Sequence, residues 1–203
     1  MKRMTKRSAN IDLSKMRKGT AVKRSLIATT ISMILAGCSS SETATVYTTL
    51  EECEAANPDN HQMCIDAYQK AKVEAERTAP RFRTFNDCAA EFGRDQCVSH
   101  QNHNGGGGWF MPMMAGYMIA NALNGHSGYV PQPVYTSHRR GSSVYGGWYG
   151  ADGTSYGSTR SRTARVSTNS FKPKPRVTRT ISRGGFGSIA SAKASFGRGG
   201  WGG

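Results

Sequence analysis

The heptapeptide Thr49-Leu-Glu-Glu-Cys-Glu-Ala55 carries the clearest local signal for structure in this chain, and it returns in altered form as Thr84-Phe-Asn-Asp-Cys-Ala-Ala90. Each copy begins with a threonine three residues ahead of a carboxylate, a pattern that is typical of a capped helix N-terminus. The carboxylates also lie where the positive end of the helix dipole favours them. The repeat therefore predicts two helix starts, each with a cysteine close behind.

The cysteines of the repeat predict two disulfides. A short turn and a second cysteine follow each copy, so that Cys53 precedes Cys64 and Cys88 precedes Cys97. Four cysteines allow three pairings. The repeat favours Cys53–Cys64 and Cys88–Cys97, each closing a loop of about ten residues and contributing roughly 2–3 kcal/mol. An even set of cysteines in disulfides is typical of an exported protein.

A long helix is predicted between the two copies. Cysteine, alanine and tyrosine side chains recur at helical spacing from Asp59 to Thr78, and Pro80 ends the pattern. Residues 46–100 would thus form a disulfide-stapled α-helical module. A module of this size is too small to depend on its hydrophobic core alone, so we expect it to require its disulfides.

The N-terminal segment has the parts of a secretory signal. Nine basic residues precede the uncharged run Ser25–Leu35, and Leu35-Ala-Gly-Cys38 follows it. The run is shorter than the roughly 20 apolar residues of a membrane-spanning helix. Because Leu-Ala-Gly-Cys resembles a bacterial lipobox, residues 1–37 are predicted to be a lipoprotein signal peptide, whether translation starts at Met1 or Met16. The alternative is a short helix with an incidental cysteine.

Cys38 is accordingly predicted to be lipidated and to carry palmitate or similar acyl chains. Two or more chains anchor a protein stably, whereas one gives marginal binding. Residues 38–45 are small and polar and would form a lipidated tether. Ser39 replaces the aspartate that is associated with inner-membrane retention, which favours an outer-membrane lipoprotein that faces the periplasm.

The charge of the chain is unevenly distributed. Its formal net charge is +14, but nine basic residues and one acidic residue belong to residues 1–37. Residues 39–100 contain 11 acidic and six basic residues, whereas residues 101–203 contain 12 basic residues and only Asp152 as an acidic one. This asymmetry indicates a folded module followed by a basic tail.

The second half of the chain is rich in glycine and poor in aliphatic residues, which indicates disorder. Residues 101–126 are predicted as a Gly-rich linker that leads into a short apolar helix within Trp109–Leu123. Val144–Tyr156 predicts one β-hairpin around Asp152-Gly153. Residues 127–203 otherwise form a basic disordered tail rich in Gly, Ser, Tyr and Arg. The predicted fold class is therefore a mostly disordered chain with a small helical module, one apolar helix and one hairpin.

The apolar helix is predicted to contact the membrane interface or a protein partner, because Met-rich and aromatic surfaces adapt to varied partners. Packing of the helix against the disulfide module is the alternative. The residues assigned to the contact are Trp109, Phe110, Met113, Met114, Tyr117 and Met118.

The arginines of the tail are predicted to contact anionic surfaces. Arg183-Gly-Gly-Phe-Gly is similar to RGG segments that bind RNA, but export would separate it from cellular RNA, so no nucleic acid is expected. Anionic lipid, lipopolysaccharide or an acidic envelope protein is the expected partner, and a spacer without a ligand is the alternative. The residues assigned to this role are Arg176, Arg179, Arg183 and Arg198.

The sequence predicts no catalytic residue, no cofactor and no metal site. The cysteines are better used in disulfides than as nucleophiles, since a catalytic thiol needs a neighbouring base. Cys97-x-x-His100-x-x-His103 offers only three metal ligands, one of them expected in a disulfide. The protein is therefore expected not to be an enzyme.

Six short segments also carry a resemblance to a family. In order, they are Leu35-Ala-Gly-Cys38, Glu51-Glu-Cys-Glu-Ala-Ala-Asn-Pro58, Glu76-Arg-Thr-Ala-Pro80, Asp87-Cys-Ala-Ala-Glu-Phe-Gly93, Met111-Pro-Met-Met-Ala-Gly-Tyr117 and Arg183-Gly-Gly-Phe-Gly187. With them the chain resembles the YgiB-type family of uncharacterised enterobacterial cell-envelope proteins, among which are predicted lipoproteins. The resemblance implies a place in the cell envelope but no substrate and no catalytic residues.

Together these observations predict a non-enzymatic outer-membrane lipoprotein whose apolar helix and basic tail contact envelope components. The alternative is an accessory or assembly subunit that binds a protein partner through Trp109–Leu123.

Overall fold

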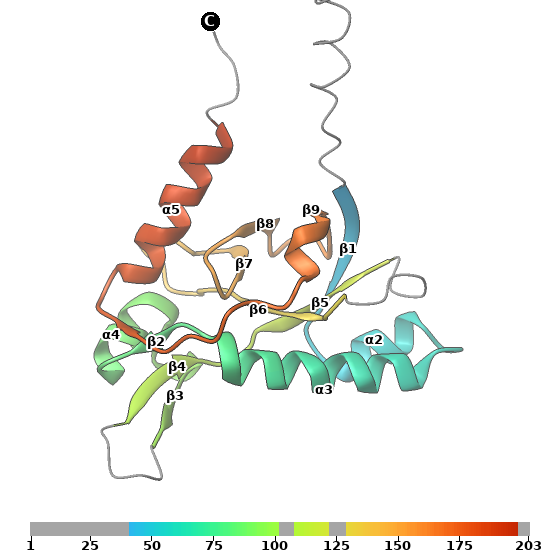
Figure 1. The fold of residues 1–203 in the computed structure, drawn as a ribbon, viewed down its shortest axis with the longest axis horizontal. Coiled ribbons are helices and arrows are strands. Elements are labelled where there is room, and N and C mark those ends of the chain that lie inside the picture. The colour runs from blue at the N-terminus through green and yellow to red at the C-terminus, as the bar shows by residue number, and fades with distance from the viewer. Residues whose placement is uncertain (1–40, 102–107, 122–128, 199–203) are drawn as a thin grey trace, which may run out of the picture. The chain divides into compact units, whose positions relative to one another are not determined.

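The computed structural model describes residues 41–101, 108–121 and 129–198, all of which belong to one compact unit. They form two β-sheets with helices packed against them (Figure 1). The prediction of a mostly disordered chain with a small helical module is therefore wrong. The β-rich fold arises from strands that pair across long stretches of sequence, which local patterns do not reveal.

The elements are short, and two of the helices are 3-10 helices, labelled η. In chain order they are β1 (Ser41–Tyr47), α2 (Leu50–Ala56), α3 (His61–Thr78), β2 (Arg81–Phe82), α4 (Phe85–Phe92), η2 (Arg94–Gln96), β3 (Cys97–His100), β4 (Trp109–Pro112), β5 (Gly116–Ala120), β6 (Gln132–Tyr135), β7 (Gly147–Gly150), β8 (Ser155–Ser158), β9 (Thr163–Ser167), η3 (Thr168–Phe171), β10 (Thr180–Ile181) and α5 (Gly185–Arg198).

Six strands form an antiparallel sheet in the order β8-β7-β6-β5-β1-β9. The edge strands β8 and β9 contact each other, so the sheet is nearly closed into a barrel. β1 starts within the segment predicted as a tether, yet it is an interior strand: Ala44 pairs with Ala120 of β5 on one side and Ala164 of β9 on the other. The hydrophobic core of the six-stranded sheet includes the buried side chains of Met118 and Trp148.

Four strands form a second sheet in the order β10-β2-β4-β3. α4 and α5 pack beside it and share a second hydrophobic cluster. At the centre of this cluster, the ring of Phe92 lies 5.2 Å from that of Phe186 and 6.0 Å from that of Phe82. Phe186 belongs to α5, so the C-terminal helix is part of the core and not an appendage.

The two helix starts predicted from the repeat are confirmed. The side chain of Thr49 accepts a hydrogen bond from the backbone N–H of Glu52, and Thr84 accepts one from Asp87, both at 3.1 Å. These bonds satisfy N–H groups that have no partner inside the helix. The long helix is confirmed as well, since α3 ends at Thr78 as predicted.

Both predicted disulfides are present, Cys53–Cys64 and Cys88–Cys97. The first joins α2 to α3 and is buried between these helices and β5 of the six-stranded sheet. The second joins α4 to β3 and therefore closes the loop that contains η2.

The apolar segment Trp109–Leu123 does not form the predicted helix over its described part. Trp109–Pro112 is strand β4 and Gly116–Ala120 is strand β5, and these strands belong to different sheets. β5 passes so close to the end of β1 that a Cβ atom on Gly116 would lie 2.6 Å from the carbonyl oxygen of Tyr47. Glycine here permits the approach of two strands, a role that helical periodicity does not detect.

The tail predicted to be disordered is folded from residue 129 to residue 198, where it supplies five strands, η3 and α5. The hairpin predicted in Val144–Tyr156 is confirmed: β7 pairs with β8, and Gly153 takes a φ of 77° in the turn between them. A lone hairpin is marginally stable, but this one continues a six-stranded sheet. None of the helices in the described ranges is long and apolar enough for a membrane span.

Candidate anion-binding cleft

The end of α4, the turn at residues 139–143 and the start of α5 meet on one side of the molecule. The guanidinium of Arg139 donates a hydrogen bond of 2.6 Å from Nη1 to the carbonyl oxygen of Ala90 in α4. The backbone N–H of Gly187 in α5 donates to Oε1 of Glu91. Direct hydrogen bonds thus link α4 to the turn and to the last helix.

Glycine is required where α5 meets α4. A Cβ atom on Gly187 would overlap with Oγ of Ser143 and Oε1 of Glu91. Phe186, next to it, is only 1% exposed and lies in the core. Arg183-Gly-Gly-Phe-Gly, which resembles an RNA-binding RGG segment, is therefore the start of a packed helix in this protein.

Glu91 is a buried carboxylate, with 5% of the residue exposed. Burial raises its pKa above the ordinary value, although hydrogen bonds from the backbone of Gly187 and Gly184 act in the opposite direction. Its second oxygen, Oε2, is buried and finds no hydrogen-bond partner among the described residues. The carboxylate therefore caps the start of α5, where the helix dipole favours negative charge, while burial disfavours its ionised form.

Two adjoining cavities open around this junction, with volumes of about 240 Å³ and 600 Å³. Ala90, Arg139 and Arg183 line both of them, so the two cavities are neighbours and are treated together as one site. Arg140 lines the smaller cavity and Arg94 the larger one. We call this site the arginine cleft, defined by Arg94, Arg139, Arg140 and Arg183.

The arginine cleft has the chemistry of an anion-binding site. All four guanidinium groups belong to exposed residues, and each offers several N–H donors in a fixed planar arrangement that matches carboxylate and phosphate oxygens. Asp95 and Glu91 are the acidic residues among the described lining. An anion with several oxygens would fit these donors.

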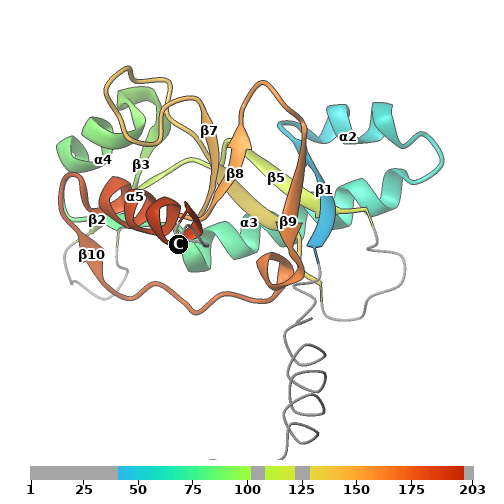
Figure 2. The same ribbon diagram turned by 90° about the horizontal axis from the view of Figure 1, so that it is seen from above.

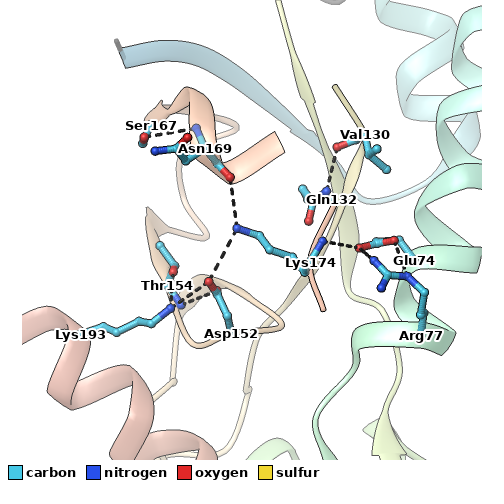
Figure 3. A network of polar contacts seen from close by, with 10 residues as sticks. All are labelled: Glu74, Arg77, Val130, Gln132, Asp152, Thr154, Ser167, Asn169, Lys174 and Lys193. Carbon is cyan, nitrogen blue, oxygen red and sulfur yellow. Dashed lines mark hydrogen bonds and ion pairs between the residues drawn. The ribbon is translucent and has the colours of Figure 1, made fainter. Parts of the chain in front are cut away.

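A polar network holds α5 against the β7–β8 hairpin (Figure 3). Nζ of Lys193 lies 2.8 Å from Oδ2 of Asp152 and donates to Oγ1 of Thr154 at 3.0 Å. Burial alone would raise the pKa of Asp152, but hydrogen bonds from Lys193 and Thr154 and the charge of Lys193 lower it overall. The ionised carboxylate is thus stabilised by the contact with α5.

The same network holds the chain that leads into β10. Nζ of Lys174 lies 3.8 Å from Oδ2 of Asp152, and the backbone N–H of Lys174 donates a hydrogen bond of 3.3 Å to Oε1 of Glu74. Arg77 pairs with the same Oε1 at 2.6 Å. These contacts (Figure 3) fix residues on both sides of Arg183, so the position of this arginine depends on the folded C-terminal segment.

The four tail arginines predicted to contact anions do not form one group. Arg183 lies in the arginine cleft, whereas Arg176 and Arg179 are exposed residues of the segment between η3 and β10 and do not line the described cavities. The side chain of Arg198 and the whole of Cys38 lie outside the described residues. Lipidation of Cys38 therefore stays a prediction.

Sequence reasoning missed three of the four arginines in the cleft. Arg94 lies inside the loop of the predicted Cys88–Cys97 disulfide, and Arg139-Arg140 is an adjacent pair followed by a glycine. Each of these was a local signal for an exposed basic residue. These three arginines lie near Arg183 only because α5 packs against α4, and no short stretch of sequence predicts that packing.

Most of the apolar residues predicted to contact a partner pack against other residues of this chain. Tyr117 and Met118 are fully buried in the six-stranded sheet, so they offer no contact surface in this fold. The Trp109 ring stacks on His100 and lies 4.2 Å beneath the guanidinium of Arg81. In a separate contact, Phe110 packs edge-on against Phe85.

The two predicted methionines of this group differ in exposure. Met113 is 41% exposed. Met114 is partly buried and packs against the hydrophobic cluster between α2, α3 and β5.

Comparison with known proteins gives a consistent result. A family model described as "Protein of unknown function (DUF1190)" matches residues 41–197. A UPF0441 protein of Serratia proteamaculans is 38% identical over 209 residues, covering 95% of this chain and 94% of that protein. UPF0441 proteins of Pectobacterium carotovorum and Klebsiella pneumoniae are 36% and 37% identical, covering 95% of this chain and 93% of each relative. No solved structure gave a match.

Proposed function

The chain belongs to the DUF1190 family of proteins of unknown function, and we propose that it is a lipid-anchored envelope protein that binds an anionic group in the arginine cleft. The relatives are enterobacterial, so the resemblance to an uncharacterised enterobacterial family that the six segments predicted is confirmed. In this proposal Cys38 carries the lipid and the folded residues face the periplasm from the outer membrane.

One observation carries the binding role: four arginines from three separate parts of the chain line two neighbouring cavities that share Arg139 and Arg183. Guanidinium groups bind phosphate and carboxylate through paired hydrogen bonds and remain charged at any physiological pH. They do not exchange protons, which favours binding over acid–base catalysis. The chemistry shared by the expected ligands is therefore a phosphate or carboxylate group on an envelope component.

A matched pair of variants tests the cleft. We expect Arg183→Gln to weaken the binding of inorganic phosphate by about tenfold or more, because a hydrogen bond to a charged group is worth roughly 1.5–3 kcal/mol and about 1.4 kcal/mol is tenfold. Arg179→Gln removes the same charge from a residue that precedes Arg183 by four positions in the sequence and does not line the described cavities. This variant should leave the affinity for phosphate nearly unchanged. Titration followed by NMR measures both. Equal weakening by the two variants would show a diffuse charge effect and contradict the cleft.

The anchor is tested separately by the mass of the protein purified from membranes. We expect a mass that matches cleavage before Cys38 plus added acyl chains. Reduction of the two disulfides should then add about four hydrogens. An unprocessed chain without acyl groups would contradict the lipoprotein proposal.

The alternative function, an assembly subunit that docks a partner through Trp109–Leu123, has less support. Of the residues assigned to that contact, Tyr117 and Met118 have no exposed surface. A partner would meet Met113, which is exposed, but a single exposed methionine is common on protein surfaces and indicates no interface.

A further inference from the structure

The chain between the proposed anchor and the folded domain is very short. Strand β1 begins at Ser41, three residues after Cys38, and three residues span at most about 11 Å when fully extended. A domain of this size has a radius of gyration of about 15 Å. The lipid-bearing residue therefore cannot move far enough from β1 for the domain to rotate freely above a membrane.

The start of β1 is held firmly in the sheet. Ser41 pairs with Ser167 of β9, and Nη2 of Arg165 donates a hydrogen bond of 3.2 Å to Oγ of Ser41. On the other side, the backbone N–H of Asn121 donates to the carbonyl oxygen of Thr43. Because β1 has a partner on both sides, it cannot peel away to lengthen the tether without breaking the six-stranded sheet.

We propose that the end of the six-stranded sheet where β1 begins lies against an anionic membrane surface, and that the arginine cleft is directed away from that surface. The inference rests on lipidation of Cys38 in the proposed function. The part of the molecule that would contact the membrane, which we call the anchor face, is defined by Ser41, Arg165, Ser167 and Lys172. Lys172 directly follows η3, which begins after Ser167, and its neighbour Phe171 accepts a hydrogen bond from the backbone N–H of Val130 just before β6.

The composition of the anchor face suits a headgroup layer. Arg165, Ser167 and Lys172 are exposed, and basic residues near an anionic membrane each favour binding by about 1 kcal/mol. Glu42, which is partly buried, adds one acidic group at this end. Tyr129 is also partly exposed and stacks on Phe171 of η3 at 5.5 Å, and tyrosine is enriched at membrane–water interfaces.

The arginine cleft lies elsewhere. In Figures 1 and 2, α4, which lines the cleft, and β1 lie on opposite sides of strands β7 and β8. The headgroup layer is only about 5–8 Å thick on each side of a bilayer. In this proposal the arginines of the cleft therefore face the surrounding space and not the leaflet that holds the anchor.

Photo-crosslinking of the lipidated full-length protein in its native membrane tests this orientation. Lys172→p-benzoyl-phenylalanine places the probe on the anchor face, and Asn86→p-benzoyl-phenylalanine places it at an exposed position of α4. We expect phospholipid adducts, identified by mass, at several-fold higher yield from the first position. Equal yields from a protein that carries its acyl chains would overturn the orientation while leaving the lipoprotein proposal intact.

Insertion of a flexible Gly/Ser linker provides the decisive control. About 20 such residues between Ser40 and Ser41 would add a mean span of about 25 Å, enough for the domain to turn over. The preference for the Lys172 position should then disappear. A preference that survived the insertion would show that the short tether is not its cause and would overturn the inference. A chain that lacks acyl groups in the same mass spectra would instead contradict the proposed function.

Discussion

At the scale of single residues, the contact between Gly187 and Glu91 decides what the Arg-Gly-Gly segment becomes. Composition alone favours disorder for such a segment. The glycine, however, fits where a Cβ atom would overlap with Ser143 and Glu91, and its N–H group is bonded to the Glu91 carboxylate. A carboxylate on one helix thus accepts a hydrogen bond from the first turn of another helix, almost a hundred residues away in the sequence.

Glu91 should make the stability of the protein dependent on pH. Because burial raises its folded-state pKa above the ordinary value of 4.5, the folded protein binds a proton more tightly than the unfolded chain does. The stabilisation is therefore complete below pH 4.5 and is lost as pH rises through the folded-state pKa, by about 1.4 kcal/mol for each unit of the shift. Denaturant unfolding of the wild type and of Glu91→Gln at several pH values measures this.

The expected result is that the wild type gains free energy of unfolding relative to Glu91→Gln as the pH is lowered from neutral to 4.5. Glu76→Gln, which alters an exposed residue of α3, controls for the loss of one carboxylate. A difference between wild type and Glu91→Gln that stays constant over this range would contradict the buried, raised pKa.

At the scale of elements, the helices near the disulfides were predictable from the sequence, whereas α5 and most strands were not. Thr49 and Thr84 cap their helices through bonds that span three residues, so the whole signal lies in one short stretch. Strand β1 depends on β5 and β9, whose paired residues follow those of β1 by seventy or more positions. The hairpin of β7 and β8 was predictable because its partners are adjacent and Gly153 marks the turn.

The two disulfides should differ in what they do for the arginine cleft. The Cys88–Cys97 bond closes the loop that carries Arg94, whereas Cys53–Cys64 joins helices that do not line the cleft. Replacing both cysteines of either pair by serine should lower the free energy of unfolding by a similar amount, roughly 2–3 kcal/mol. Only the Cys88→Ser, Cys97→Ser variant should also weaken phosphate binding, because Arg94 is then held less firmly.

Titration of both double variants under conditions where each is folded measures this difference. The Cys53→Ser, Cys64→Ser variant serves as the matched control for lost stability. If both variants bind phosphate as the wild type does, the Cys88–Cys97 disulfide does not position Arg94 for binding.

At the scale of the whole molecule, the last forty residues complete the core. Phe186 is 1% exposed and Ala190 3% exposed, both in the cluster of the four-stranded sheet. Removal of one buried phenylalanine side chain costs about 3–5 kcal/mol, a large share of the 5–15 kcal/mol that typically stabilises a domain. We therefore expect the segment predicted as a disordered tail to be required for folding.

A truncation series tests this requirement. A chain that ends after Phe171 lacks β10, α5 and the Lys193–Asp152 pair, so we expect it to lose cooperative thermal unfolding. A chain that ends after Arg198 keeps every described element and should unfold like the full-length protein. Circular dichroism during heating compares them. Cooperative unfolding of the shorter chain would show that the first sheet is stable without the C-terminal helix.

The candidate site also becomes visible only at this scale. The sequence indicated that Arg183 contacts anions, and this remains the proposal for it. Its neighbours in the cleft come from α4, from η2 and from the turn before β7, and nothing in the spacing of Arg94, Arg139 and Arg183 predicts that they meet. The folded C-terminal segment brings them together.

The interior position of β1 also sets an order of events during biogenesis. Ser41 pairs with Ser167, so the first strand to leave the ribosome gains its last partner only after more than a hundred further residues, roughly 6–25 s later at typical rates of synthesis. Such distant pairings make folding slow. A nascent chain therefore cannot complete the six-stranded sheet until residue 167 has been synthesised.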